Sequence, residues 1–163
     1  MTHNVPSGSR LEAEIRPHKG RPMVFINGEP HPLPGFNPKT RRGPFVKSLP
    51  FFCEHKMGVY IIQPSIARFW TGVPQDMEED YFSLDEQAGL VLDGDPEAYL
   101  MVRFTPHPPK WWSDTHRQEY FITEEGTTPG LPSFSSDLFW ETMAQASAAV
   151  IRYCESRPWA SRW

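Results

Sequence analysis

The sequence has few cysteines, no strong excess of either charge and no long apolar run, and each of these features excludes a class of protein. Its two cysteines, Cys53 and Cys154, have neither disulfide-framework nor metal-site spacing, so we expect two reduced, partly buried thiols. Sixteen basic and twenty acidic residues give a formal charge of −4 without a basic cluster, which argues against a nucleic-acid partner. No apolar run could span a bilayer and no signal-peptide pattern opens the chain, so we predict a cytoplasmic protein without a membrane partner.

Motifs that hold cofactors or activate nucleophiles are also missing. No Gly-rich phosphate loop follows the apolar segments at 59–63 and 98–104. His107 and His116 have no acid or cysteine in ligand spacing, so neither a metal nor another cofactor is expected. No serine lies in a Gly-x-Ser-x-Gly elbow, which excludes that class of hydrolase site.

The 163-residue chain nevertheless has the composition of a folded protein, because 39% of its residues are hydrophobic and 13% are aromatic. Residues 1–10 are predicted to be a disordered N-terminus. Apolar and charged residues alternate from Leu11 to Arg16, and a second apolar run ends at Asn27-Gly28. This pattern predicts an antiparallel β-hairpin over residues 11–32.

Strands and helices are expected to alternate after the hairpin. The runs VYIIQ (59–63) and AYLMVRF (98–104) are continuously apolar, which is typical of parallel strands covered on both faces. A capping box at Ser83–Glu86 predicts a helix over about 84–93. A second helix is expected to open at Ser135, Ser136 and Asp137, and its apolar positions recur at steps of three and four: Phe139, Met143, Ala146, Val150 and Tyr153.

Two weaker elements precede the first of these strands. A short apolar piece from Leu33 to Phe36 is a candidate inner strand. Residues 43–56 are predicted to form a short helix interrupted near Pro50, because proline removes a helical hydrogen bond.

This order of elements predicts an α/β fold, either a doubly wound sheet or part of a (β/α)8 barrel. The loops at 64–82 and 105–134 are long and rich in aromatic residues and proline, as expected where strand ends build a barrel's active site. We therefore expect a partial (β/α)8 (TIM) barrel over residues 33–163, comprising about the first three β/α units.

Several loose motifs together resemble a known family: W…DYFSLDEQAGLVLDGDPEAYLMVRFTPHPPKWW…HRQE…G…PSFSSDLFWETM. Their order and spacing are similar to the N-terminal half of the catalytic barrel of glycoside hydrolase family 42 and related β-galactosidase-like proteins. The segment GRPMVFINGEPH is similar to the hairpin that often precedes such a barrel. The resemblance covers roughly residues 21 to 163.

The resemblance implies a retaining glycoside hydrolase, an enzyme class that uses two carboxylates about 5 Å apart. In the family both are glutamates, on the fourth and seventh barrel strands, and no residue of this chain matches either. Glu119, Glu124 and Glu125 fit no catalytic motif, so no catalytic residue is assigned and the chain alone is expected to be inactive. The main hypothesis is a hydrolase fragment that contributes sugar-binding walls. The alternative is a non-catalytic carbohydrate-binding or protein-interaction module.

The candidate substrate-binding residues surround the end of the second apolar strand. Trp111 and Trp112 are suited to stack on a sugar ring, although adjacent side chains point apart and only one is expected to face a pocket. Trp70 could form the opposite wall, His107 could bind a hydroxyl, and Arg103 could orient a carboxylate. For each residue the competing interpretation is structural: packing for the aromatics and charge balance for Arg103.

The expected partners are a saccharide, by resemblance, and further copies of the chain. Three strands cannot close a barrel, so the sheet would expose an unpaired edge and apolar faces. Self-association through exposed sheet edges is therefore predicted.

Overall fold

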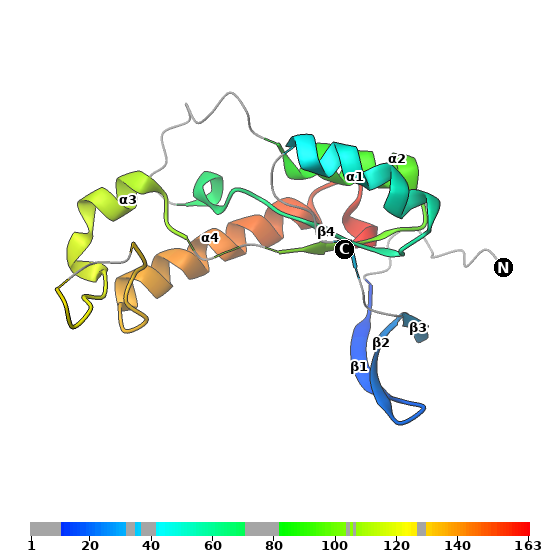
Figure 1. Ribbon diagram of the computed structural model, residues 1–163, viewed down its shortest axis with the longest axis horizontal. Helices are drawn as coiled ribbons and strands as arrows, with labels where there is room; N and C mark the ends of the chain where they lie inside the picture. Colours follow the sequence, from blue (N-terminus) through cyan, green and yellow to red (C-terminus); the bar gives the residue numbers. More distant parts are fainter. Residues whose placement is uncertain are drawn as a thin grey trace. The chain divides into compact units, whose positions relative to one another are not determined.

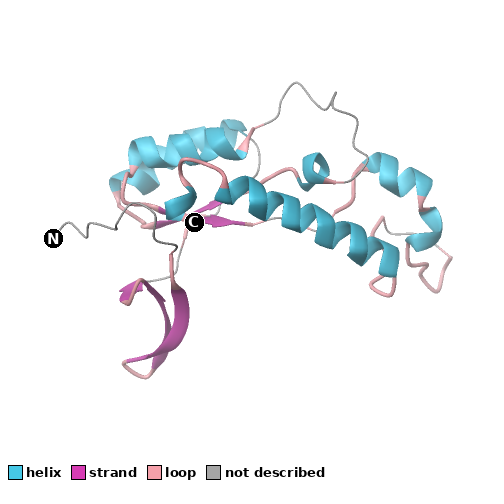
Figure 2. Ribbon diagram, turned by 180° about the vertical axis from the view of Figure 1, so that it is seen from behind, coloured by secondary structure: helices cyan, strands magenta, loops and turns pink. Residues whose placement is uncertain are grey.

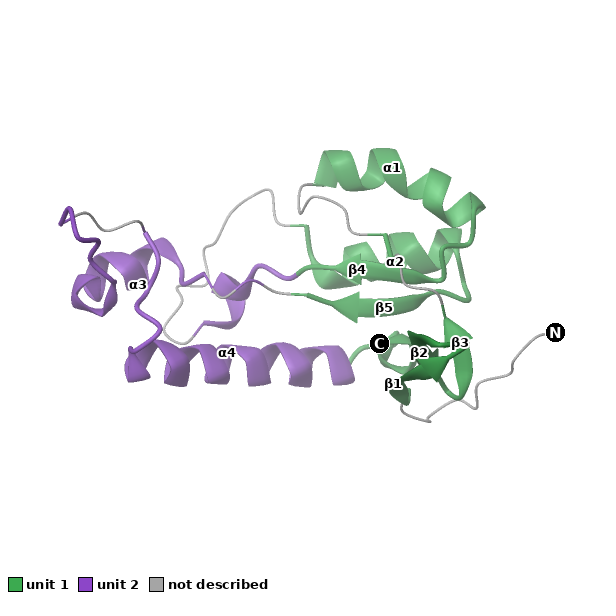
Figure 3. Cartoon of the chain, turned by 60° about the horizontal axis from the view of Figure 1, so that its bottom comes forward, with its two compact units in different colours: residues 1–63, 82–103, 156–163 green, residues 64–81, 104–155 purple. Residues whose placement is uncertain are grey.

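The chain forms two compact units in a computed structural model (Figure 1). Unit 1 comprises residues 1–63, 82–103 and 156–163, and unit 2 comprises residues 64–81 and 104–155 (Figure 3). The residues that the structure describes are 11–31, 35–36, 42–70, 82–103, 105, 107–126 and 130–163. The N-terminus at 1–10, predicted to be disordered, lies outside them.

The predicted hairpin is confirmed, and a third strand extends it. Strands β1 (Ala13–His18), β2 (Arg21–Ile26) and β3 (Glu29–His31) form an antiparallel sheet in that order. Both turns have two residues in the left-handed region, with φ of 51° and 76° at Lys19-Gly20 and 49° and 84° at Asn27-Gly28. Such turns match the twist of paired strands, so Asn27-Gly28 starts a second hairpin.

The two apolar runs form the parallel pair of unit 1. Strand β4 (Val59–Ile62) pairs with β5 (Tyr99–Val102), and helix α2 (Leu84–Gly94) connects them. Phe36 makes an isolated parallel bridge with Tyr60, at the end of the weak apolar piece from Leu33; residues 33 and 34 lie outside the described part.

The prediction of a partial (β/α)8 barrel is wrong. Over the described ranges, the strands form a three-stranded antiparallel sheet and a separate two-stranded parallel sheet, with four α-helices and no succession of barrel-type β/α repeats. Apolar runs and helix caps report on single elements, whereas barrel closure depends on pairing between strands far apart in the sequence. The local signals therefore identified a β-α-β connection but not the number of strands around it.

Two helices cover one side of the parallel pair in unit 1 (Figure 3). Helix α1 (Arg42–Glu54) packs against α2, and α2 packs against β4. Helix α1 runs without a break through Pro50, so the expected interruption there is wrong. The core of these elements is apolar: Phe45, Leu49, Val59, Ile62, Leu84, Ala88, Val91 and Leu100.

The predicted helix start at Ser83 is confirmed. The Ser83 hydroxyl accepts a hydrogen bond from the Glu86 backbone N–H at 3.1 Å, which satisfies a free donor of the first turn. The Glu86 carboxylate pairs with Arg42 at 2.7 Å and so links α2 to α1.

The C-terminal residues also belong to unit 1. After helix α4, Trp159 donates its Nε1–H to Asp85 at 2.8 Å, and Arg157 pairs with the same carboxylate at 3.5 Å. The short helix η3 (Ala160–Arg162) follows, and the Arg162 guanidinium lies 6.0 Å from the ring centre of Tyr99.

Gly94 ends α2 directly against Cys53. A methyl group at position 94 would lie 2.7 Å from Cys53 Sγ and 3.1 Å from Cys53 Cβ, closer than packed atoms approach. We expect Gly94→Ala to lower the free energy of unfolding by about 1–3 kcal/mol, as overpacking does. Urea denaturation measures this, and Gly94→Ala with Cys53→Ala should recover part of the loss because the clashing sulfur is gone. Equal losses in both backgrounds would contradict this contact.

Unit 2 is built around helix α4 (Asp137–Glu155), the longest helix in Figure 2. Ser136 caps it, because its hydroxyl accepts from the Phe139 N–H at 3.0 Å. Helix α4 packs on the short helix η1 (Ile66–Phe69). Its predicted apolar stripe is buried at Phe139, Met143, Ala146 and Val150, while Tyr153 is partly buried and its ring contacts Phe69 at 5.5 Å.

Candidate functional site

The proline-rich segment after β5 sets the orientation of the two adjacent tryptophans. It leads into helix α3 (Lys110–Thr115), where the Pro109 carbonyl accepts from the N–H groups of Trp112 at 3.0 Å and Ser113 at 3.2 Å. Successive helical residues point about 100° apart. Trp112 consequently turns into unit 2 and is 2% exposed, whereas Trp111 is partly exposed.

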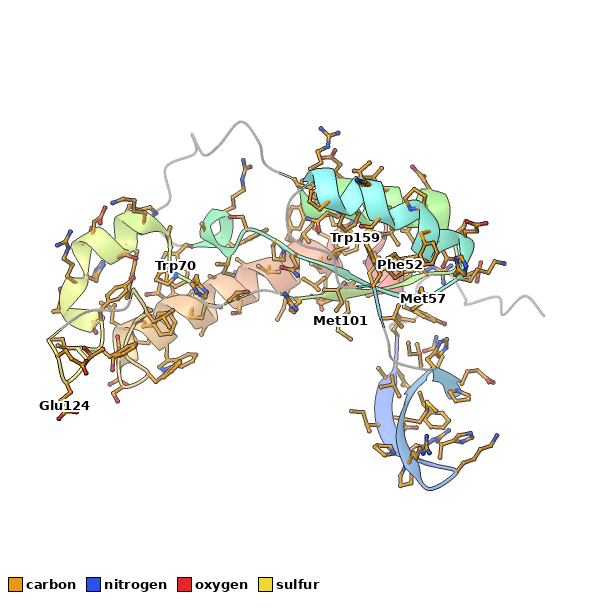
Figure 4. The ribbon with its side chains drawn as sticks, viewed as in Figure 1. Phe52, Met57, Trp70, Met101, Glu124 and Trp159 are labelled. Carbon is orange, nitrogen blue, oxygen red and sulfur yellow. The ribbon has the colours of Figure 1, made fainter. Side chains whose placement is uncertain are left out.

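Trp112 is the centre of an aromatic cluster in unit 2. Its ring centre lies 5.8 Å from that of Trp70 and 6.1 Å from that of Phe139, both in edge-on geometry, and His116 stacks on it at 4.7 Å. Trp70 (Figure 4) is itself only 2% exposed. The faces of Trp70 and Trp112 are therefore occupied by protein, as the packing interpretation requires.

Trp111 differs from its neighbour because part of it reaches solvent while its indole N–H does not. The Nε1 donors of Trp111 and Trp70 are buried and have no acceptor among the residues that the structure describes. An unsatisfied buried donor costs about 1–3 kcal/mol, so native structures usually pair such a donor with a protein acceptor or with water.

The two polar candidates lie at the surface. Arg103 continues β5, with its N–H bonded to the Ile62 carbonyl at 3.0 Å, and it is exposed. His107 is also exposed, and its backbone N–H bonds to the Thr105 carbonyl at 2.8 Å. Arg103 belongs to unit 1 and the other four candidates to unit 2, where the structure brings Trp70 and Trp112 into contact.

The acidic residues of the loop after α3 have identifiable surroundings. Glu119, at the end of helix η2 (Arg117–Glu119), accepts from the Ser136 hydroxyl at 2.6 Å, so it supports the cap of α4. Glu124 and Glu125 are exposed, and Figure 4 shows Glu124 at the outer tip of its loop. Hydrogen bonds from its own backbone N–H and from Thr123 lower the pKa of the Glu125 carboxyl.

An exposed apolar surface of unit 2 was missed by the sequence analysis. We name it the apolar loop surface and define it by six side chains that are 36–74% exposed: Phe121, Ile122, Leu131, Phe134, Leu138 and Trp140. Leu131, Phe134 and Leu138 do not belong to the apolar stripe predicted for α4. In the sequence they therefore look like ordinary residues of a loop and a helix end. The available signal was the density of large apolar residues in a stretch expected to face water.

A buried polar cluster lies in the core of unit 1. The Tyr60 hydroxyl is 3.0 Å from Asp95 Oδ2 and 3.1 Å from the Phe52 carbonyl oxygen, and both can accept its proton. Burial, together with the hydrogen bond to Asp95, raises the pKa of Tyr60. Burial also raises the pKa of the Cys53 thiol, against a hydrogen bond with Tyr60 that lowers it, and the Asp95 charge adds to the rise. With both groups held neutral, this cluster serves stability.

The described residues contain no group of three or more His, Cys, Asp or Glu side chains arranged to hold a metal ion. Nor does any helix in the described ranges combine the length and apolarity needed to cross a membrane. No family model matches the chain, and no curated protein matches it significantly.

Proposed function

We propose that the chain is a saccharide-binding part of a β-galactosidase-like hydrolase and carries no catalytic carboxylate pair of its own. The sequence motifs that resemble glycoside hydrolase family 42 support this proposal. The observation that carries it is the different burial of the two adjacent tryptophans. Trp112 is buried in the aromatic cluster, whereas Trp111 is partly exposed to solvent.

The environment of Trp111 suits a sugar ring. An aromatic face packs on the C–H groups of a sugar with little loss of side-chain entropy, because the side chain has only two rotatable bonds. The bonds to the Pro109 carbonyl hold the first turn of α3, so the backbone at Trp111 is fixed before a ligand arrives. The Trp111 N–H is buried, so a sugar would contact the exposed part of the indole ring and not this donor.

Replacing Trp111 with alanine is expected to weaken the binding of a β-linked galacto-oligosaccharide about tenfold, or about 1.4 kcal/mol, because the stacking face is lost. Isothermal titration calorimetry measures the change. Trp111→Phe should keep most of the affinity, because phenylalanine retains an aromatic face for the sugar. Phe51→Ala is the matched control, because Phe51 is an aromatic residue of unit 1 that is 60% exposed.

Unchanged affinity in Trp111→Ala would remove Trp111 from the site. Absence of binding by the unaltered chain would contradict the proposed function itself. An equal loss in Phe51→Ala would show a general effect on the fold rather than a contact.

A second candidate function, a non-catalytic protein-interaction module, is favoured by the apolar loop surface. Six large, exposed apolar side chains on two loops and the start of α4 exceed what single exposed residues explain. Self-association through the outer edge of β5 remains a proposal as well, since within the described ranges β5 pairs only with β4. A cytoplasmic location, with no nucleic-acid partner, also remains a prediction.

A further inference from the structure

We propose that the apolar loop surface docks a basic, amphipathic segment of a partner protein, in which lysine or arginine side chains alternate with apolar ones. This inference rests on the second candidate function, the interaction module, and adds the chemistry of the partner. It is independent of saccharide binding at Trp111.

The apolar loop surface is assembled by short-range contacts between two loops and the start of α4. An antiparallel bridge between Tyr120 and Pro132 places Phe121 opposite Leu131. The Ser133 N–H bonds to the Glu119 carbonyl at 2.7 Å and fixes the same pair of segments. The two loops therefore present their apolar side chains together.

The aromatic part of the surface is held in place before any partner binds. The rings of Phe134 and Trp140 stack with centres 6.1 Å apart and planes 23° apart. Trp140 Nε1 donates to the Phe134 carbonyl at 2.9 Å, which fixes the indole orientation. Phe134 is 74% exposed and Trp140 44% exposed, so both rings can contact a partner. Rings that are fixed in advance lose little entropy on binding.

The chain segment that carries this surface has charged side chains of one sign. Between Arg117 and Arg152 the sequence contains no lysine, arginine or histidine, and it contains five acidic residues: Glu119, Glu124, Glu125, Asp137 and Glu141. All except Glu119 are exposed. Exposed carboxylates on the same segment attract cations and repel acidic partners, and an exposed indole face adds a cation–π contact with lysine or arginine. Charge complementarity therefore selects a basic occupant.

The test measures fluorescence anisotropy of two labelled helical peptides of identical pattern, one built from leucine and lysine and the other from leucine and glutamate. The Leu/Lys peptide should bind at least about tenfold more tightly, and its affinity should fall as salt is added. Trp140→Ala and the double variant Glu124→Gln/Glu141→Gln should each weaken its binding about tenfold. Ile151→Ala and Glu155→Gln are matched controls on α4, and circular dichroism confirms that each variant is folded.

Equal binding of both peptides, or full affinity in the Glu124→Gln/Glu141→Gln variant, would overturn the basic partner and leave an apolar interaction surface. No binding of either peptide would overturn the interaction module too. Losses in Glu155→Gln equal to those in the double variant would show non-specific attraction and overturn the docking site. Oligomers that Trp140→Ala converts to monomers would identify a second copy of the chain as the occupant instead of another protein.

Discussion

Replacing Trp112 with alanine is expected to lower the free energy of unfolding by about 3–5 kcal/mol, the range for removing a large aromatic side chain from a core. Trp112 is 2% exposed, and its ring contacts those of Trp70, His116, Tyr120 and Phe139. Its loss would leave a cavity in unit 2 that the surrounding elements cannot fully fill. Urea denaturation followed by circular dichroism measures the change. Trp112→Phe should lose less, because it keeps one ring in the cluster.

Trp111→Ala is the matched control for this prediction, since it removes the same side chain one residue earlier in the same helix. Its loss in stability should stay below about 1 kcal/mol, as for partly exposed positions without a buried network. A larger loss for Trp111→Ala than for Trp112→Ala would contradict the assignment of Trp112 to the core and Trp111 to the surface.

The free energy of unfolding is expected to fall as the pH rises above about 9. In the folded chain the pKa values of Cys53 and Tyr60 are both raised, so the unfolded chain releases these protons first. Their stabilisation is complete below the unfolded pKa values, about 8.5 for cysteine and 10 for tyrosine, and is lost as the pH rises through the folded values. The slope is up to about 1.4 kcal/mol per pH unit for each group.

Urea denaturation between pH 8 and 11 measures this slope. Tyr60→Phe should flatten the curve above pH 10, because phenylalanine has no proton to lose. Tyr99→Phe, at a partly exposed tyrosine on the neighbouring strand, should leave the slope as it is. A curve that is the same in all three proteins would show that the buried Tyr60 hydroxyl does not govern stability at high pH.

Elements with strong local signals were predicted correctly. The alternation before Lys19 and the run to Ile26 gave the hairpin, and the capping residues Ser83 and Ser136 marked the starts of α2 and α4. Each signal acts within a few residues, through side-chain alternation or a cap hydrogen bond, so neighbouring sequence suffices.

Features that depend on distant segments were not predictable in the same way. The number of barrel strands depends on pairing between distant segments, and the parallel sheet of the described residues has two strands, β4 and β5. Helix α3 lies within residues 105–134, which were predicted to be a long loop, so that prediction is wrong for Lys110–Thr115. Trp70 packs against Trp112, which lies more than forty positions later in the sequence. No local sequence pattern predicts a contact of this kind.

The most direct test of the central claim is an NMR titration of the unaltered chain with a β-linked galacto-oligosaccharide, observing the indole N–H signals of its six tryptophans. We predict that the Trp111 signal moves progressively to saturation, while that of Trp159, whose N–H is bonded to Asp85, stays in place. Trp111→Phe assigns the signal. Shifts confined to other tryptophans, or no shift at millimolar saccharide, would contradict a sugar-binding role for Trp111.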